Sequence, residues 1–514
     1  MIILQSKYLL NSFLQEQLLS MRIFVFIFIS FYFHNTACFS QFKWTPNCSA
    51  AFSSLFSADI STCLLQIENE KKKNPENQLP FYLDAYTAFF EYLLCQSDDQ
   101  SRKYFQKIDK NLKQISNSDK KAEGFHYYRA EIRFHSAIVN FLNGSYISSL
   151  DAMLTSYNLL TESQKEHPNF IQNLKLQSIF SLIFQYAGDE FSWLKTAMPD
   201  YKNQVIGFQL FDLYQKKVAQ QTQIKEEIFI LNVLLHFYLD SDELQAFHLS
   251  SGNQSTQVSV VMKLVNIVVC LKANKNEQAL QILEKIGQDE RKKIPFFDYF
   301  EGAARLNKLD KNALTFFERF LRNYAGSNCK KSAWQKILWH KMIFTDAVQA
   351  ELYRQEILSK GKTDIELDKS AQNEIIRSKK YNLQLLRSRL LFDGGYYAEA
   401  LNILRNEIDF QKLENQSDGI EFLYRSGRIH QKLGNTDLAL RYFGLCAEAG
   451  KNSNLSYSSN ACMNIAKIYS EQLLYCKANQ YYKAAMEHNK LSNSRSINLK
   501  AKAEIKKLKK YACP

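Results

Sequence analysis

The 514-residue sequence predicts an all-α fold, specifically an α-solenoid of stacked antiparallel helix pairs resembling a superhelix. Three observations support this prediction. Alanines recur every 39 residues near the C-terminus, at Ala400, Ala439 and Ala478. The chain holds only 16 Gly and 7 Pro, with no proline between Phe296 and Cys513, so residues that break helices are scarce. Alternating strand-like runs joined by turn dipeptides are absent, which excludes a sheet domain.

Residues 1–40 are predicted to be an upstream extension followed by a signal peptide, with translation starting at Met21. Arg22 precedes eleven uncharged residues, Ile23–Phe33, and small residues follow them. A short basic start and an apolar run well below the ~20 residues of a membrane span are typical of secretory signals. We expect cleavage after Ser40; lipidation at Cys38 and a retained signal anchor are the alternatives. Each would place the protein in the periplasm or at the outer membrane.

An N-terminal helical region is predicted for residues 41–255. Its first part, 41–78, has the composition of a leader, and helices are expected after it. The expected helices are Phe81–Gln96, Asp99–Ile115, Ala122–Phe141 and Ile147–Leu160. The dipeptide Asn143-Gly144 predicts the turn between the last two.

Helix pairs are predicted for residues 256–345, where Ala279 and Ala313 lie 34 residues apart. Residues 346–490 should hold one long helix, from Asp364 to Arg389, followed by the C-terminal repeats. Residues 491–514 predict a lysine-rich helix that caps the array, with contact to an acidic lipid surface as the alternative.

The repeats predict close helix crossings. Small side chains at a crossing let two backbones approach, and an aromatic or leucine side chain four residues later fills the next space. Glycines just after the first helix of a pair suit a left-handed cap. The residues assigned to these crossings and turns are Ala279, Ala313, Gly395, Ala400, Gly427, Gly434, Ala439, Phe443, Ala466, Ala478 and Tyr482.

This pattern of small residue, turn, alanine and aromatic resembles the tetratricopeptide repeat, over roughly Val260–Phe320 and Tyr381–His488. The tetratricopeptide repeat usually has a tryptophan in its first helix, and this chain has other residues at that position, for example Gln384. The run from Phe392 to Tyr397, Phe-Asp-Gly-Gly-Tyr-Tyr, together with Trp193-Leu194, is similar to an uncharacterised exported tetratricopeptide family of Bacteroidota-type bacteria. The resemblance implies export, a helical fold and a concave groove that binds peptides; it implies no known activity.

If the repeat register holds, three cations spaced 39 residues apart lie on one face of the first helices: Arg389, Arg428 and Lys467. Leu385, Tyr424 and Met463 lie one turn earlier, and Arg425 is a further contributor. A cationic ladder beside an apolar strip suits an extended acidic peptide. The alternative is that these are ordinary surface cations of a basic protein.

Composition limits the function. The net charge of +13 favours acidic partners in general, but no basic motif with interleaved aromatics indicates nucleic-acid binding. No phosphate loop, nucleophile elbow or metal-ligand spacing occurs, so we expect no enzyme activity, no cofactor and no metal. The sequence therefore predicts a protein-interaction scaffold or peptide-binding adaptor. A glycan-binding outer-membrane lipoprotein built on similar helices is the alternative, disfavoured by few tryptophans and few insertions.

Ten cysteines remain. Cys48 and Cys63 lie close together after the signal, so they form either a disulfide or two buried thiols. Cys270, Cys446, Cys462 and Cys476 fall on apolar helix faces and are predicted to be small core residues.

Overall fold

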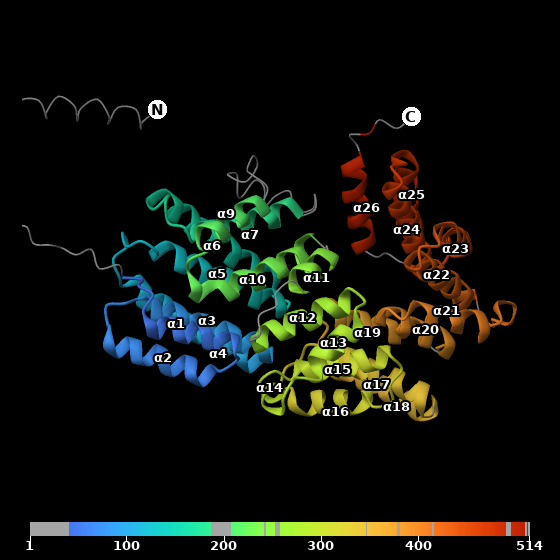
Figure 1. The fold of residues 1–514 in the computed structure, drawn as a ribbon, viewed down its shortest axis with the longest axis horizontal. Helices are drawn as coiled ribbons and strands as arrows, with labels where there is room; N and C mark the ends of the chain where they lie inside the picture. The colour runs from blue at the N-terminus through green and yellow to red at the C-terminus, as the bar shows by residue number, and fades with distance from the viewer. Residues whose placement is uncertain are drawn as a thin grey trace, which may run out of the picture.

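A computed structural model describes residues 41–186, 207–240, 243–251, 258–345, 347–377, 381–413, 416–489, 495–508 and 511. Within these ranges the chain consists of helices joined by short turns, without a strand (Figure 1). Consecutive helices pack mainly against each other, so the predicted all-α solenoid is confirmed. The predicted signal peptide, including Cys38, lies outside the described residues, as does Trp193.

The N-terminal body occupies the left of Figure 1. Its helices are α1 (Pro46–Phe56), α2 (Ile60–Lys73), α3 (Leu79–Cys95), α4 (Asp98–Ser116), α5 (Phe125–Leu142), α6 (Tyr146–Glu166), α7 (Asn173–Tyr186), α9 (Gly207–Lys217), α10 (Lys225–Leu235) and α11 (Glu243–Ser251). The predicted turn at Asn143-Gly144 separates α5 from α6.

The leader expected at 41–78 is instead a helical hairpin that belongs to the core. The side chain of Thr45 accepts a hydrogen bond from the Cys48 amide and begins α1, with Pro46 at the first helical position. Asp59 caps α2 in the same way. Phe52 and Cys63 are almost fully buried against the following helices, so this segment is fixed by apolar packing.

The middle of the chain continues the stack with helices α12 to α19. They are α12 (Val260–Lys272), α13 (Asn276–Leu283), α14 (Gln288–Lys293), α15 (Phe296–Asn307), α16 (Ala313–Asn323), α17 (Lys330–Phe344), α18 (Ala347–Ser359) and α19 (Glu366–Arg377).

The C-terminal arm rises on the right of Figure 1. Its helices are α20 (Leu383–Gly394), α21 (Tyr397–Asn406), α22 (Gln416–Lys432), α23 (Thr436–Ala449), α24 (Tyr457–Glu471), α25 (Tyr475–His488) and α26 (Arg495–Leu508). The single helix expected from Asp364 to Arg389 is wrong. The chain forms α19 and α20 separately, because the Asn382 side chain caps a new helix by accepting a hydrogen bond from the Leu385 amide.

The five repeat alanines lie at helix crossings, and all of them are inaccessible to solvent: Ala279, Ala313, Ala400, Ala439 and Ala478. The residue four positions after each is buried as well. At Gly427 a side-chain carbon would lie 2.6 Å from the Phe443 ring, and at Gly302 it would lie 2.9 Å from the Phe317 ring. Small residues therefore make room for the aromatic side chain of the partner helix.

The turns inside the five pairs share one backbone conformation. The residue four or five positions before each alanine has a positive φ: Asn274 (58°), Leu309 (59°), Gly395 (85°), Gly434 (78°) and Leu473 (62°). Left-handed geometry suits glycine and tolerates asparagine, whereas the two leucines adopt it under strain. The sequence identified this position only where glycine occupies it.

The Asp-Gly-Gly-Tyr run joins two repeats that are far apart in the sequence. A side-chain carbon at Gly395 would lie 2.1 Å from the Asn274 carbonyl oxygen. Asn274 Nδ2 donates to the Asp393 carbonyl at 2.9 Å, and Tyr396 Oη donates to Glu277 Oε1 at 2.7 Å. The turn between α20 and α21 thus contacts the turn between α12 and α13, although α14 to α19 lie between these repeats in the chain.

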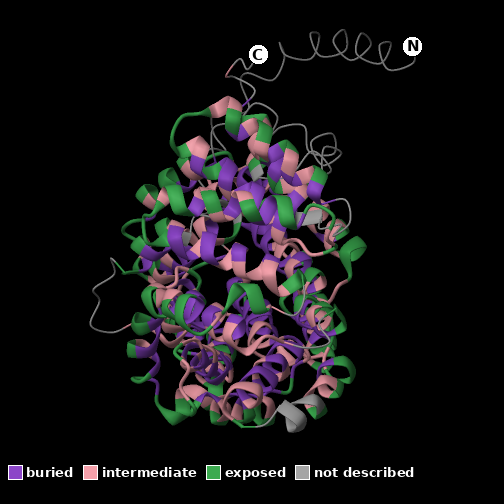
Figure 2. Ribbon diagram, turned by 90° about the vertical axis from the view of Figure 1, so that its right-hand side faces the viewer, coloured by how far each residue is buried: buried purple, intermediate pink, exposed green. Residues whose placement is uncertain are grey.

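The buried residues follow the inside of the stack, and exposed residues cover its outer faces (Figure 2). One continuous apolar core runs through the body and the middle helices as far as Leu390. The arm instead has a separate small core at each helix pair. Helix α26 closes the arm: Ile497, Ala501 and Leu508 are buried, while Lys502, Lys506 and Lys507 face solvent.

Candidate functional site

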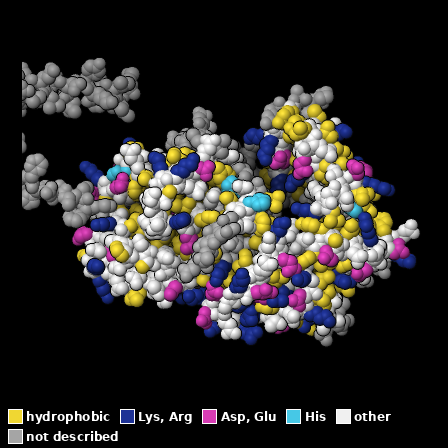
Figure 3. All heavy atoms as spheres, in the orientation of Figure 1, with side chains coloured by type: hydrophobic (Ala, Val, Ile, Leu, Met, Phe, Trp, Pro, Cys, Tyr) yellow, Lys and Arg dark blue, Asp and Glu magenta, His cyan; other side chains and the backbone are white. Residues whose placement is uncertain are grey.

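The surface is hollowed between the N-terminal body and the C-terminal arm, and Lys and Arg side chains lie along this hollow (Figure 3). Cations and aromatic rings from α17, α20, α22 and α24 form one connected group, which we call the inner-face cluster. It comprises Lys336, Trp339, Glu374, Arg389, Phe392, Glu421, Tyr424, Arg425, Arg428 and Tyr457.

Arg389 links α20 to the two helices before it. Its Nη1 donates to Glu374 Oε1 on α19 at 2.9 Å, and its guanidinium lies 4.7 Å from the centre of the Trp339 ring on α17. Burial opposes the charge of Arg389, but Glu374 and Asp393 outweigh it and raise its pKa. The arginine is therefore fixed and internally neutralised rather than free to bind an acid.

Arg425 forms a second internal pair. Its Nε donates to Glu421 Oε1 at 2.7 Å, one helical turn away on α22. Burial opposes ionisation of Glu421, yet the charges of Arg425 and Arg389 lower its pKa. The Tyr457 ring on α24 lies 5.3 Å from the Tyr424 ring, so this polar group extends across neighbouring repeats.

Arg428 differs from these two arginines. Its guanidinium lies 4.4 Å from the Phe392 ring centre, and its Nη1 lies 3.4 Å from Tyr424 Oη. Among the residues described, no carboxylate forms an ion pair with it. A cation packed against an aromatic ring is oriented but not neutralised, so Arg428 can bind a carboxylate from a partner.

The predicted ladder is thus only partly a surface feature. Arg389 and Arg428 belong to the inner-face cluster, Tyr424 is partly exposed, and Lys467 is exposed on α24 without a recorded partner. Leu385 and Met463 are core residues, packed in the small cores of their own helix pairs. The apolar strip was predicted on the groove face, but of its three residues only Tyr424 lies there, since Leu385 and Met463 face the packed side of their helices.

The sequence did not identify Lys336, Trp339 or Glu374 as site residues. They come from α17 and α19, which lie outside the repeat, so no 39-residue spacing marks them. The stacking of α20 against α17 brings them to Arg389.

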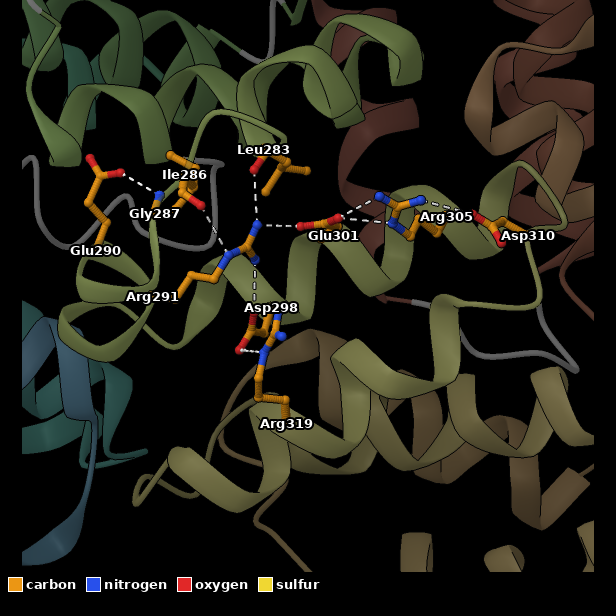
Figure 4. A network of polar contacts seen from close by, with 10 residues as sticks. All are labelled: Leu283, Ile286, Gly287, Glu290, Arg291, Asp298, Glu301, Arg305, Asp310 and Arg319. Atoms are coloured by element: carbon orange, nitrogen blue, oxygen red, sulfur yellow. Dashed lines mark hydrogen bonds and ion pairs between the residues drawn. The ribbon is translucent and has the colours of Figure 1, made fainter.

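A second polar network lies between α14, α15 and α16 (Figure 4). Asp298 accepts hydrogen bonds from Arg291 at 2.8 Å and from Arg319 at 2.6 and 2.7 Å. Glu301 pairs with Arg291 at 2.5 Å and with Arg305 at 2.8 Å, and Arg305 also pairs with Asp310 at 2.9 Å. Three arginines thus face three carboxylates, so the network is balanced and fixes the helices.

A third polar group is deeply buried in the body. Lys175 on α7 contacts Glu131 on α5 at 2.5 Å and Glu227 on α10 at 3.0 Å. His135 stacks on Phe89 at 4.3 Å, and burial lowers its pKa from the ordinary 6.5 to about 4. These groups connect helices within the body and are closed to solvent, so they are internal contacts and not an accessible binding site.

No group of three or more His, Cys, Asp or Glu side chains in the described part of the chain is arranged to hold a metal ion. Of the helices described, none combines the length and apolarity that crossing a bilayer requires.

The structure decides between the two alternatives for Cys48 and Cys63 and differs from the prediction at Cys476. Cys48 and Cys63 are free buried thiols and form no disulfide: Cys63 Sγ lies 3.2 Å from Thr87 Oγ1, and Cys48 lies beside Thr45 and Asn77. Cys270, Cys446 and Cys462 are buried thiols, as expected. Cys476, predicted to be a core thiol, is instead disulfide-bonded and lies partly exposed at the start of α25.

No protein-family model matches this chain, and no curated protein matches it. Among solved structures, a chain from the "Structure of Naa15/Naa10 bound to HypK-THB" is similar, with 14% identity and a TM-score of 0.24. The match covers 89% of this chain and 65% of that chain, so it spans less than two thirds of that chain's length. The site described above therefore depends on this chain's own structure.

Proposed function

We propose that this protein is an exported helical-repeat scaffold that binds an extended segment of a partner protein on the inner face of its C-terminal arm. The observation that carries the proposal is Arg428. It is the inner-face arginine that is held against an aromatic ring without an internal carboxylate. Tyr424 beside it supplies apolar area and a hydroxyl group, and such Arg and Tyr side chains commonly dominate binding energy.

Two observations support location in the cell envelope. The segment from Met21 to Ser40 has the composition of a secretory signal. The disulfide at Cys476 would persist in an oxidising compartment and not in a reducing cytoplasm. An alkaline phosphatase fusion after residue 60, active only outside the cytoplasm, would test the export, and a cytoplasmic fusion product would contradict it.

The tryptophans that the structure describes do not favour the glycan-binding alternative. Stacking on a sugar requires an accessible aromatic face, and among the described tryptophans Trp44 and Trp334 are half-buried and Trp339 is buried. We likewise propose no enzymatic role.

The peptide-binding proposal can be tested with a defined ligand. A peptide selected from a random displayed library against residues 41–514 would be measured by calorimetry with the wild type, Arg428→Met and Tyr424→Ala. Losing one charge-assisted contact should weaken binding roughly tenfold, about 1.4 kcal/mol. Arg102→Met is the matched control, because Arg102 is 70% exposed on the body. Unchanged affinity in both inner-face variants would refute this site.

A further inference from the structure

One face of α17 holds a cation and two N–H donors that form no well-aligned hydrogen bond. Ser332, Gln335, Lys336 and Trp339 are spaced so that they share this face, which lies toward α15 and α20. Lys336 Nζ donates to Ser332 Oγ at 2.9 Å and lies 5.6 Å from the ring centres of both Tyr299 and Trp339. We call these four residues the Lys336 cluster.

The carboxylates near Lys336 form their contacts with other groups. Glu374 pairs with Arg389, and Asp368 accepts hydrogen bonds from the amides of Cys329 and Ser332. The Asp393 side chain is exposed at the end of α20. Within the described residues, Lys336 therefore forms no ion pair. Burial, and next to it the charge of Arg389, lowers its pKa to about 8, as expected for an ammonium group without a counter-ion.

Two buried donors in the same cluster form no well-aligned hydrogen bond. Trp339 is 4% exposed and Gln335 is 5% exposed; Gln335 Nε2 has no partner among the described residues, and Trp339 lies beside the Tyr381 hydroxyl without a well-aligned hydrogen bond from Nε1. An indole nitrogen can only donate, and a buried donor without a partner costs about 1–3 kcal/mol. An occupant that accepts hydrogen bonds would remove this cost.

Lys336, Gln335 and Trp339 each present an N–H group that needs a hydrogen-bond acceptor, and Lys336 also needs a negative charge. We propose that the Lys336 cluster binds a small carboxylate group, with one oxygen toward Lys336 and the other toward the Trp339 indole. A carboxylate offers two acceptor oxygens and no donor. It is also flat and smaller than a tetrahedral phosphate. This site shares Lys336 and Trp339 with the inner-face cluster but takes no contact from Arg428.

The probe for this site is acetate, with the whole folded protein labelled at its indole nitrogens. The four tryptophans give four indole N–H resonances, and Trp339→Phe assigns the one that matters. Sodium acetate should shift the Trp339 resonance saturably, while sodium chloride at equal ionic strength should not. Lys336→Met should abolish the saturable shift. Trp339→Phe has no resonance to follow, so its acetate affinity is measured by chemical modification of Lys336, and it should be roughly tenfold weaker.

A second measurement needs no variant. Modification of Lys336 by an amine-reactive reagent, followed by mass spectrometry, should slow as acetate saturates, while modification of the exposed Lys467 stays unchanged. A Trp339 shift that is linear in acetate or equal in chloride would overturn the proposal. Tighter binding of inorganic phosphate would overturn the assignment to carboxylates.

Discussion

Gly395 and Gly434 occupy the same position in successive repeats, and replacing each by alanine separates backbone strain from close contact. Both have a left-handed backbone, with φ of 85° and 78°. An alanine there costs about 1 kcal/mol in conformational strain at either site. At Gly434 nothing lies within 4 Å of the added carbon, whereas at Gly395 the Asn274 carbonyl oxygen lies at 2.1 Å.

The added carbon at Gly395 must therefore displace the turn that carries Asn274. The hydrogen bonds from Asn274 to the Asp393 carbonyl and from Tyr396 to Glu277 lie at this contact. Each is worth about 0.5–1.5 kcal/mol, so their loss adds about 1–3 kcal/mol to the strain. We expect Gly434→Ala to reduce the free energy of unfolding by about 1 kcal/mol and Gly395→Ala to reduce it by about 2–4 kcal/mol.

Urea unfolding followed by tryptophan fluorescence would measure both changes, and amide hydrogen exchange would locate them. In Gly395→Ala, exchange should accelerate at residues 274–279 as well as at 395–400, although these segments are far apart in the sequence. In Gly434→Ala it should accelerate only locally. Equal losses in the two variants, or unchanged exchange at 274–279, would refute the contact between these turns.

Three further predictions follow from the described contacts. Leu473→Gly should stabilise the arm by up to about 1 kcal/mol in urea unfolding, because a 68% exposed leucine gives up left-handed strain and little burial; a loss of stability would contradict this. Asp298→Asn should cost about 3 kcal/mol, since two arginines lose a buried acceptor, while Asp289→Asn, 91% exposed, should cost under about 0.5 kcal/mol in the same assay. The folded-state pKa of His135 is lowered to about 4, so the stability that depends on neutral His135 is present above pH 6.5 and is lost as the pH falls toward 4, by up to about 3 kcal/mol. His135→Phe, which preserves stacking on Phe89, should flatten the dependence of the urea midpoint on pH in that window, and an unchanged slope would count against it.

The sequence predicted correctly those features that every repeat shares, such as a small residue at each helix crossing. The alanine at each crossing must be small for the helices to approach, so its spacing predicted the pairs and the burial of Ala400, Ala439 and Ala478. The sequence predicted less well those features that occur at a single place in the chain. The cap at Asn382 that separates α19 from α20, and the packing of Leu385 and Met463, depend on neighbours that no spacing reveals.

By itself, the sequence determined that this protein is a helical solenoid with a capping helix, because helix breakers are scarce and small residues recur with the period of a helix pair. Only the tertiary structure decided which cations are available. Glu374 neutralises Arg389, and Glu421 neutralises Arg425. Arg428 packs against the Phe392 ring, and Lys336 packs against two aromatic rings. Neither Arg428 nor Lys336 forms an ion pair among the described residues. The reason is physical: a charge's availability is set by the groups around it, and stacking brings those groups from distant helices.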